Sequence, residues 1–159
     1  MVMPMMVGSE FCHLRPSGAV GIGQANKPED VEFVRFGLAC KRKQAIAAGK
    51  ASVPRYAQFL DSTQNLQMTG GMDRQLDLAI RAFQTSQDLK SDGVVSTSTQ
   101  AIAPSGNRYT FVHLVNAMVT IHPGTYPRID LVQETGIALS NAVKKIFQVE
   151  HPSGKMELK

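Results

Sequence analysis

Two carboxylates stand where acid–base chemistry is possible. Asp73 and Asp77 are four residues apart, so in a helix they lie one turn apart, and two neighbouring carboxylates can work as an acid pair. A solvated helix N-terminus explains the same residues more simply, because acidic side chains stabilise the positive end of a helix. We therefore predict a structural role for both.

The cysteines and histidines give little support for nucleophilic or metal chemistry. Cys12 and Cys40 lack a CxxC spacing, and four scattered histidines place a base near either thiol only by chance. His113 and His122 have no partner at metal-ligand spacing. No Ser-His-Asp order, HExxH motif or glycosidase signature is present. We expect no catalytic residue, no metal and no cofactor.

Aromatic residues and an arginine gather in the C-terminal part of the chain. Tyr109, Phe111, Tyr126 and Arg128 surround its loops, and an exposed aromatic patch with arginine is typical of a protein interface. Tyr109, Tyr126 and Arg128 are therefore candidates for partner binding. We favour the alternative, in which these side chains seal the C-terminal helices onto the core.

The composition is that of an ordinary folded domain. The chain has 159 residues, 43% of them hydrophobic and 19% charged, with a net charge of +4. A chain of this length buries enough surface to fold without metal or disulfide staples. No apolar run approaches the ~20 residues that cross a bilayer, so we expect no membrane span. The N-terminus does not have the pattern of a signal peptide.

Basic residues concentrate in residues 1–60 of the chain. Lys41, Arg42 and Lys43, followed by Lys50 and Arg55, give weak attraction to polyanions such as nucleic acid. Lysines near the C-terminal end of a helix also complement the helix dipole. We favour this second interpretation over a nucleic-acid site.

Hydrophobic periodicity predicts a mostly α-helical fold. Helical spacing extends over about 28–48, 54–66, 74–89 and 111–121. Weaker signals predict a short helix after Thr97 and a last helix from Asp130. Asn26 and Thr97 are expected to cap the helices that follow, since each has Glu or Gln three residues later. No segment alternates strictly with period two.

Turn and loop residues divide the chain into four parts. Residues 1–19 are expected to be disordered or vector-derived, because GSEF at 8–11 is similar to a cloning scar. Residues 20–106 form a helical domain, 107–150 a helical extension packed on it, and 151–159 a tail. Within the domain, 66–72 and 89–95 match at an offset of 23, each with a glycine turn and an apolar residue two places later.

The second of these units resembles a known family. AIRAFQ at 79–84, DGVV at 92–95 and Thr99 are similar to the AIxxFQ helix and the DGxxGxxT turn of the small three-helix peptidoglycan-binding domain. This domain is often attached to bacterial cell-wall hydrolases. Upstream, NKPEDV at 26–31 resembles the lead into the first helix in one branch of such proteins, so the resemblance covers about residues 20–103.

The chain departs from the family pattern at several positions. Ser96 replaces the second glycine of the DG turn, Thr69 replaces the aspartate of the first turn, and Arg35 stands where the family usually has glutamine. The positions expected to be buried keep their type. The resemblance therefore implies a three-helix peptidoglycan-binding-like bundle, here with a C-terminal helical extension.

The resemblance also implies a ligand groove beside the turn of Asp92 and Gly93. Arg81 suits a carboxylate because its planar guanidinium donates two parallel hydrogen bonds. Gln84 suits the amides of a stem peptide, and Thr99 adds a hydroxyl. The structural alternative, which we favour for the turn itself, is that Asp92 satisfies local amides and that Arg81 and Gln84 stand on an exposed helix face.

The implied function is noncatalytic binding of peptidoglycan that targets or anchors a partner, such as a cell-wall hydrolase or a secretion-system toxin component, in the periplasm or cell envelope. Two alternatives stay open. One is a cell-wall-degrading enzyme or exported antibacterial effector component with a site of unfamiliar pattern. The other is weak nucleic-acid binding through the basic helix.

Overall fold

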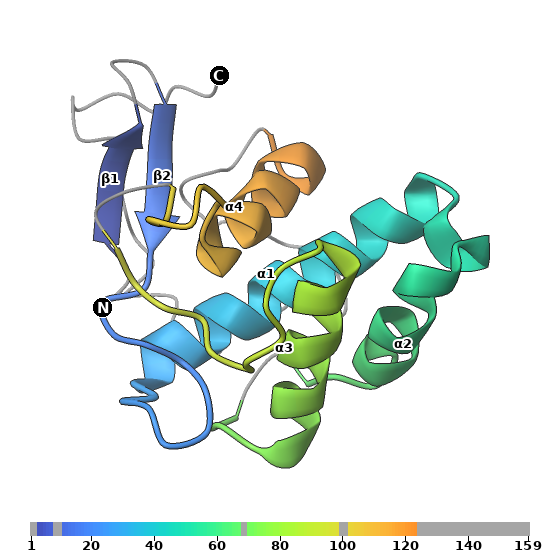
Figure 1. The fold of residues 1–159 in the computed structure, drawn as a ribbon, viewed down its shortest axis with the longest axis horizontal. Coiled ribbons are helices and arrows are strands. Elements are labelled where there is room, and N and C mark those ends of the chain that lie inside the picture. Colours follow the sequence, from blue (N-terminus) through green and yellow to red (C-terminus); the bar gives the residue numbers. More distant parts are fainter. Residues whose placement is uncertain (1–2, 8–10, 68–69, 99–101, 124–159) are drawn as a thin grey trace.

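Figure 1 shows the fold in a computed structural model that describes residues 3–7, 11–67, 70–98 and 102–123. At 3–7 and 11–14 it describes the backbone alone. The described chain is mostly helical, with four α-helices: α1 (Pro28–Ala47), α2 (Pro54–Thr63), α3 (Arg74–Ser86) and α4 (Thr110–Ile121). A short 3-10 helix, η1 (Lys50–Ser52), joins α1 to α2. The predicted mostly α-helical class is confirmed.

Helix α1 runs through the middle of the bundle. It contacts the other three α-helices, and α2 and α3 also pack on each other. Nine consecutive residues of α1, from 30 to 38, are buried, so this stretch is enclosed on all sides. Gly37 allows α4 to approach closely, because a Cβ atom there would lie only 2.9 Å from the Cβ of Leu114.

One hydrophobic core joins the helices. Ile80, Phe83 and Val95 all belong to it and are inaccessible to solvent, as the two-unit interpretation of the sequence requires. The largest fully buried side chains are Phe33, Phe36, Phe59, Phe83, Phe111, Leu38, Leu76, Ile80 and Leu114. The core is therefore built from residues of all four helices.

The start of α1 differs from expectation. Pro28 occupies the first turn, where a missing N–H costs no helical hydrogen bond. The predicted cap by Asn26 is wrong, because Lys27 precedes the helix and its side chain makes no capping hydrogen bond. The Asn26 amide instead donates to the carbonyl of Gly21 at 2.8 Å and accepts from its N–H at 2.9 Å. It closes the loop ahead of the helix.

The short helix predicted after Thr97 is wrong for the described residues 94–98 and 102–103, which are not helical. Val95 forms a β-bridge with Val20, and Ile102 forms one with Arg108. The Thr97 hydroxyl caps no helix there: it donates to the carbonyl of Pro16 and accepts from Nη1 of Arg15 at 3.2 Å. Long-range pairing, which local spacing does not reveal, replaces the helix.

The N-terminal segment contains a hairpin that the sequence does not predict. Strands β1 (Met3–Val7) and β2 (Phe11–Arg15) form an antiparallel hairpin, with Met3 opposite Arg15 and Val7 opposite Phe11. Strand β2 contacts α4, and Figure 1 shows the hairpin beside that helix. The backbone hydrogen bonds of each strand are made with the other strand. The sequence of a single five-residue strand does not reveal this pairing.

The segment after the hairpin is tied to both ends of the helical domain. The buried carboxylate of Asp30, in the first turn of α1, accepts from the N–H groups of Ser17 and Gly18, each at 3.0 Å. Gly21 then lies against the second glycine turn: its φ is +154°, and a Cβ atom would lie 2.6 Å from the carbonyl oxygen of Gly93. Only glycine fits so close a backbone approach.

Several predictions from the sequence fall on residues outside the described ranges. The last helix from Asp130, the tail at 151–159, and Thr99, Tyr126 and Arg128 are among them. In the part of the chain that is described, no helix is both long and apolar enough to cross a bilayer.

Candidate functional site

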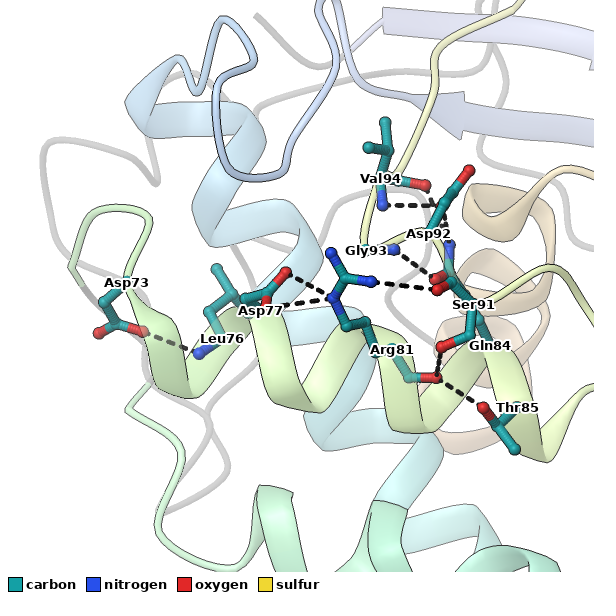
Figure 2. A network of polar contacts seen from close by, with 10 residues as sticks. All are labelled: Asp73, Leu76, Asp77, Arg81, Gln84, Thr85, Ser91, Asp92, Gly93 and Val94. Atoms are coloured by element: carbon teal, nitrogen blue, oxygen red, sulfur yellow. Dashed lines mark hydrogen bonds and ion pairs between the residues drawn. The ribbon is translucent and has the colours of Figure 1, made fainter.

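Gln84 is the central residue of the predicted site, and it is buried, contrary to the exposed helix face expected for it. Only 1% of its surface is exposed. Its Oε1 accepts from the N–H of Gly93 at 2.9 Å, and its Nε2 donates to the carbonyl of Val94 at 3.0 Å (Figure 2). Nε2 also lies 3.1 Å from Oδ1 of Asp92 and 3.2 Å from the hydroxyl of Thr110. One amide therefore fixes the whole turn.

The tight turn predicted at Asp92 and Gly93 is present. Gly93 has a φ of +73°, and Oδ1 of Asp92 accepts from the N–H of Val94 at 2.9 Å. A Cβ atom on Gly93 would lie 2.6 Å from Oδ1 of Asp77 and 2.9 Å from Nε of Arg81. The turn thus packs directly on α3: its positive φ favours glycine, and a larger residue would also displace the ends of the Asp77 and Arg81 side chains.

Arg81 braces the outer side of the same turn. Its Nε lies 3.1 and 3.2 Å from the two carboxylate oxygens of Asp77, and its Nη1 donates to the carbonyl of Ser91 at 3.2 Å. The Ser91 hydroxyl donates back to the carbonyl of Arg81 at 3.0 Å. Figure 2 shows this exchange along α3. The sequence suggests that Arg81 pairs with the carboxylate of a ligand. In the structure Arg81 pairs with the carboxylate of Asp77 instead.

The two carboxylates considered as an acid pair have separate structural partners. Oδ1 of Asp73 accepts from the N–H of Leu76 at 2.8 Å and so caps α3. Its Oδ2 lies 3.3 Å from Nη2 of Arg35. Asp77 pairs with Arg81. Asp73 therefore stands at a solvated helix N-terminus as predicted, whereas Asp77 is buried and held by Arg81 rather than by solvent.

A pocket of about 200 Å³ opens beside the turn. One wall comes from the end of α3 and the turn, including Gln84, Lys90 and Asp92, and the other from the loop before α4, including Arg108 and Tyr109. Of the predicted ligand residues, Gln84 and Asp92 line the pocket. Arg81 and Gly93 are not among its lining residues.

The pocket combines parts of two sites that the sequence keeps apart. Tyr109, a candidate for partner binding, lines the same pocket as Gln84 and Asp92. Its ring stacks on that of Phe111, with centroids 5.9 Å apart and planes 20° apart. Phe111 itself is fully buried. Tyr109 thus both joins α4 to the core and forms part of the pocket wall.

Lys90 and Arg108 are pocket residues that sequence reasoning missed. They are 18 positions apart and belong to no motif. The β-bridge between Ile102 and Arg108 turns the loop back beside the end of α3. No local pattern in the sequence predicts that this loop lies beside the end of α3.

The basic segment of α1 is partly used within the fold. Nη1 of Arg42 donates to the carbonyl of Leu60, and it lies 3.1 Å from the hydroxyl of Thr63. Lys41 lies over the ring of Tyr56, 5.9 Å from its centroid. Burial lowers the pKa of Lys41, with Tyr56 opposing this shift and the cations of Lys50 and Arg55 adding to it.

Burial shifts the pKa of the Cys40 thiol and of two imidazoles. Burial raises the pKa of the Cys40 thiol to about 12, so the thiol is protonated and unreactive at neutral pH. Burial lowers the pKa of both His113 and His122. Among the residues that the structure describes, no three His, Cys, Asp or Glu side chains gather where they could hold a metal ion.

Comparisons of this chain with family models, with curated proteins and with solved structures found no match.

Proposed function

We propose that this protein binds peptidoglycan without cleaving it and thereby targets or anchors a partner at the cell wall. The observation that carries the proposal is the pairing of the two motifs behind the resemblance: Gln84 of AIRAFQ holds the N–H of Gly93 at 2.9 Å and the carbonyl of Val94 at 3.0 Å. Two segments that carry the resemblance, 79–84 and 92–95, are thus joined in one structural unit.

The pocket beside this unit supports recognition of a small polar part of the wall. Gln84, Asp92 and Tyr109 line it, and it holds about 200 Å³. A ligand bound in so small and open a site is held weakly, since few of its atoms make contact. On a polymer with many repeated sites, or beside a second module, weak binding still gives firm retention.

Sedimentation with purified sacculi tests the proposal. The native protein is expected in the pellet. Ser105→Trp places a large side chain on the pocket wall from an exposed position and is expected to move the protein to the supernatant. Ser52→Trp, at an exposed position of η1, is the matched control and should sediment like the native chain. Native protein that stays in the supernatant refutes the proposal.

Two further readouts separate the other functional classes. Clearing of a turbid sacculus suspension by the purified chain alone would indicate a cell-wall-degrading enzyme. Retention on nucleic acid that falls steeply with salt, and that is lost in Lys41→Gln/Lys43→Gln, would indicate the basic helix instead. Peptidoglycan binding predicts no clearing and little effect of these two substitutions on sedimentation.

A further inference from the structure

Two cations on the pocket wall have no partner in the described part of the chain. Three arginines elsewhere, Arg35, Arg55 and Arg81, are each paired with an aspartate. By contrast, the side chains of Lys90 and Arg108 form no hydrogen bond or ion pair with any described residue, and both line the pocket. Positive charge is thus available at one place on the surface.

The rest of the pocket wall narrows the chemistry of the ligand. Ser105 and Asn107 add side-chain donors that have no hydrogen-bond partner among the described residues. Asp92 adds a single negative charge: its Oδ1 is held by the turn, and the residue is exposed. A phosphate would leave the Asp92 carboxylate without a counter-charge, whereas a purely apolar group would leave both cations without one.

We propose that the pocket binds an amino-acid end that carries a carboxylate and an ammonium group on the same carbon atom. The carboxylate lies toward Lys90 and Arg108, and the ammonium toward Asp92. Hydrogen bonds between charged groups are roughly twice as strong as those between neutral groups. The inference rests on the proposed function, because the diamino-acid residue of an uncrosslinked stem peptide offers such an end.

The size of the pocket agrees with this ligand. Sites for drug-sized molecules measure roughly 300–1,000 Å³, and this pocket, at about 200 Å³, is smaller. It suits one amino-acid end better than a disaccharide of the glycan strand. Leu89, Val94 and Ala103 provide apolar wall for the methylene groups that follow.

The first experiment compares three small probes by NMR titration of the amide signals of Gly93 and Asn107. The probes are meso-diaminopimelic acid, pimelic acid, which lacks both ammonium groups, and cadaverine, which lacks both carboxylates. Because each analogue loses one set of charged hydrogen bonds, we expect each to bind about tenfold more weakly than diaminopimelic acid. Equal binding of all three overturns the inference.

Single substitutions then measure how much each charged side chain of the pocket contributes to binding. Lys90→Gln and Arg108→Gln are each expected to weaken binding of diaminopimelic acid by about fivefold to tenfold. Asp92→Asn retains Oδ1 as an acceptor for the turn but loses the charge, so the preference for diaminopimelic acid over pimelic acid should shrink. Arg74→Gln removes an exposed cation outside the pocket and should leave binding unchanged. An equal loss in Arg74→Gln would indicate nonspecific charge and would refute the site.

Sacculus sedimentation separates failure of this inference from failure of the proposed function. If the double variant Lys90→Gln/Arg108→Gln still sediments with sacculi as the native chain does, the inference fails and peptidoglycan binding stands. If the native chain binds diaminopimelic acid but not sacculi, the pocket stands and the proposed function fails. Loss of both activities in the double variant, with an unchanged melting temperature, is the result expected.

Discussion

Two buried polar side chains hold two glycine turns in this fold. Gln84 donates to the carbonyl of Val94 at 3.0 Å, and Nη2 of Arg35 donates to the carbonyl of Gly71 at 2.6 Å. The two carbonyls are separated by 23 residues, which is the offset of the sequence repeat. Gly93 and Gly70 occupy the corresponding positive-φ positions, at +73° and +126°.

The difference between the turns lies in what each side chain is able to offer. The Gln84 amide both donates and accepts, so it also takes the N–H of Gly93. A guanidinium only donates, so Arg35 holds the carbonyls of Gln67 and Gly71 and accepts nothing. Its Nε is buried with no hydrogen-bond partner among the described residues. The side-chain amide of Gln84 thus binds both an N–H and a carbonyl group of its turn, whereas the guanidinium of Arg35 binds carbonyl groups only.

The largest expected effect comes from Gln84→Leu, which releases the second turn. It leaves the N–H of Gly93 and the carbonyl of Val94 without their partner, and each buried group left unpaired costs about 1–3 kcal/mol. We expect a loss of about 3–5 kcal/mol in the free energy of unfolding, measured in urea. Gln75→Leu, at an exposed position of the same helix, should change it by less than about 0.5 kcal/mol.

Substitutions of Arg35 test the first turn. Arg35→Met removes every donor to the carbonyls of Gln67 and Gly71, and we expect a loss of about 2–3 kcal/mol. Arg35→Gln makes the first turn resemble the second and retains a shorter donor, so the loss should be about 1–2 kcal/mol. Urea unfolding of both variants checks the order. If Arg35→Gln is the less stable of the two, the proposed equivalence of the turns is wrong.

A smaller effect is expected where Asp73 joins the first turn to α3. It caps the helix through the N–H of Leu76 at 2.8 Å. Loss of such a cap typically costs about 1 kcal/mol, so Asp73→Ala should reduce stability by about that amount. Asp88→Asn breaks an exposed ion pair with Arg55, keeps a residue type that tolerates the φ of 56° at this position, and should cost less than about 0.5 kcal/mol. Thermal unfolding of both variants provides the comparison.

The smallest expected effect is a decrease in stability at low pH. It arises from His113 in α4 and reaches the second turn through that helix. Burial lowers the pKa of His113, so the folded state binds a proton less readily than the unfolded state. Stability is therefore full above the unfolded pKa of about 6.5 and falls as the pH drops below it. Urea unfolding at pH 7.5 and pH 5 should show this decrease.

The control for pH is His113→Gln, which should have a smaller decrease between the same two pH values. Because Thr110, the first residue of α4, lies 3.2 Å from Nε2 of Gln84, loosening of α4 should first appear as faster hydrogen exchange at Gly93. A decrease that is the same in His113→Gln would assign the pH effect to other groups.

Local rules predicted the parts of the fold that depend on neighbouring residues. The periodicity of Ile80 and Phe83 located α3, and Gly93 located the second turn. Each of these features depends on residues within about two helical turns, so a single sequence carries the signal.

What the sequence did not predict depends on distant partners. Gln84 looks like a surface residue until the turn and Thr110 fold over it. Lys90 and Arg108 meet at one pocket only because the intervening loop bends back on itself. The same limit explains why the bridge between Val20 and Val95 was missed.

The close approach of Gly21 to Gly93 has a consequence for the order of folding. Arg15 and Thr97, which flank this contact, are 82 residues apart in the chain. Bringing such distant segments together costs loop entropy before any contact repays it. The helices are therefore expected to assemble early, and the strap of residues 15–21 to close last. A mutation such as Gly21→Ala should then speed unfolding while scarcely slowing the refolding rate.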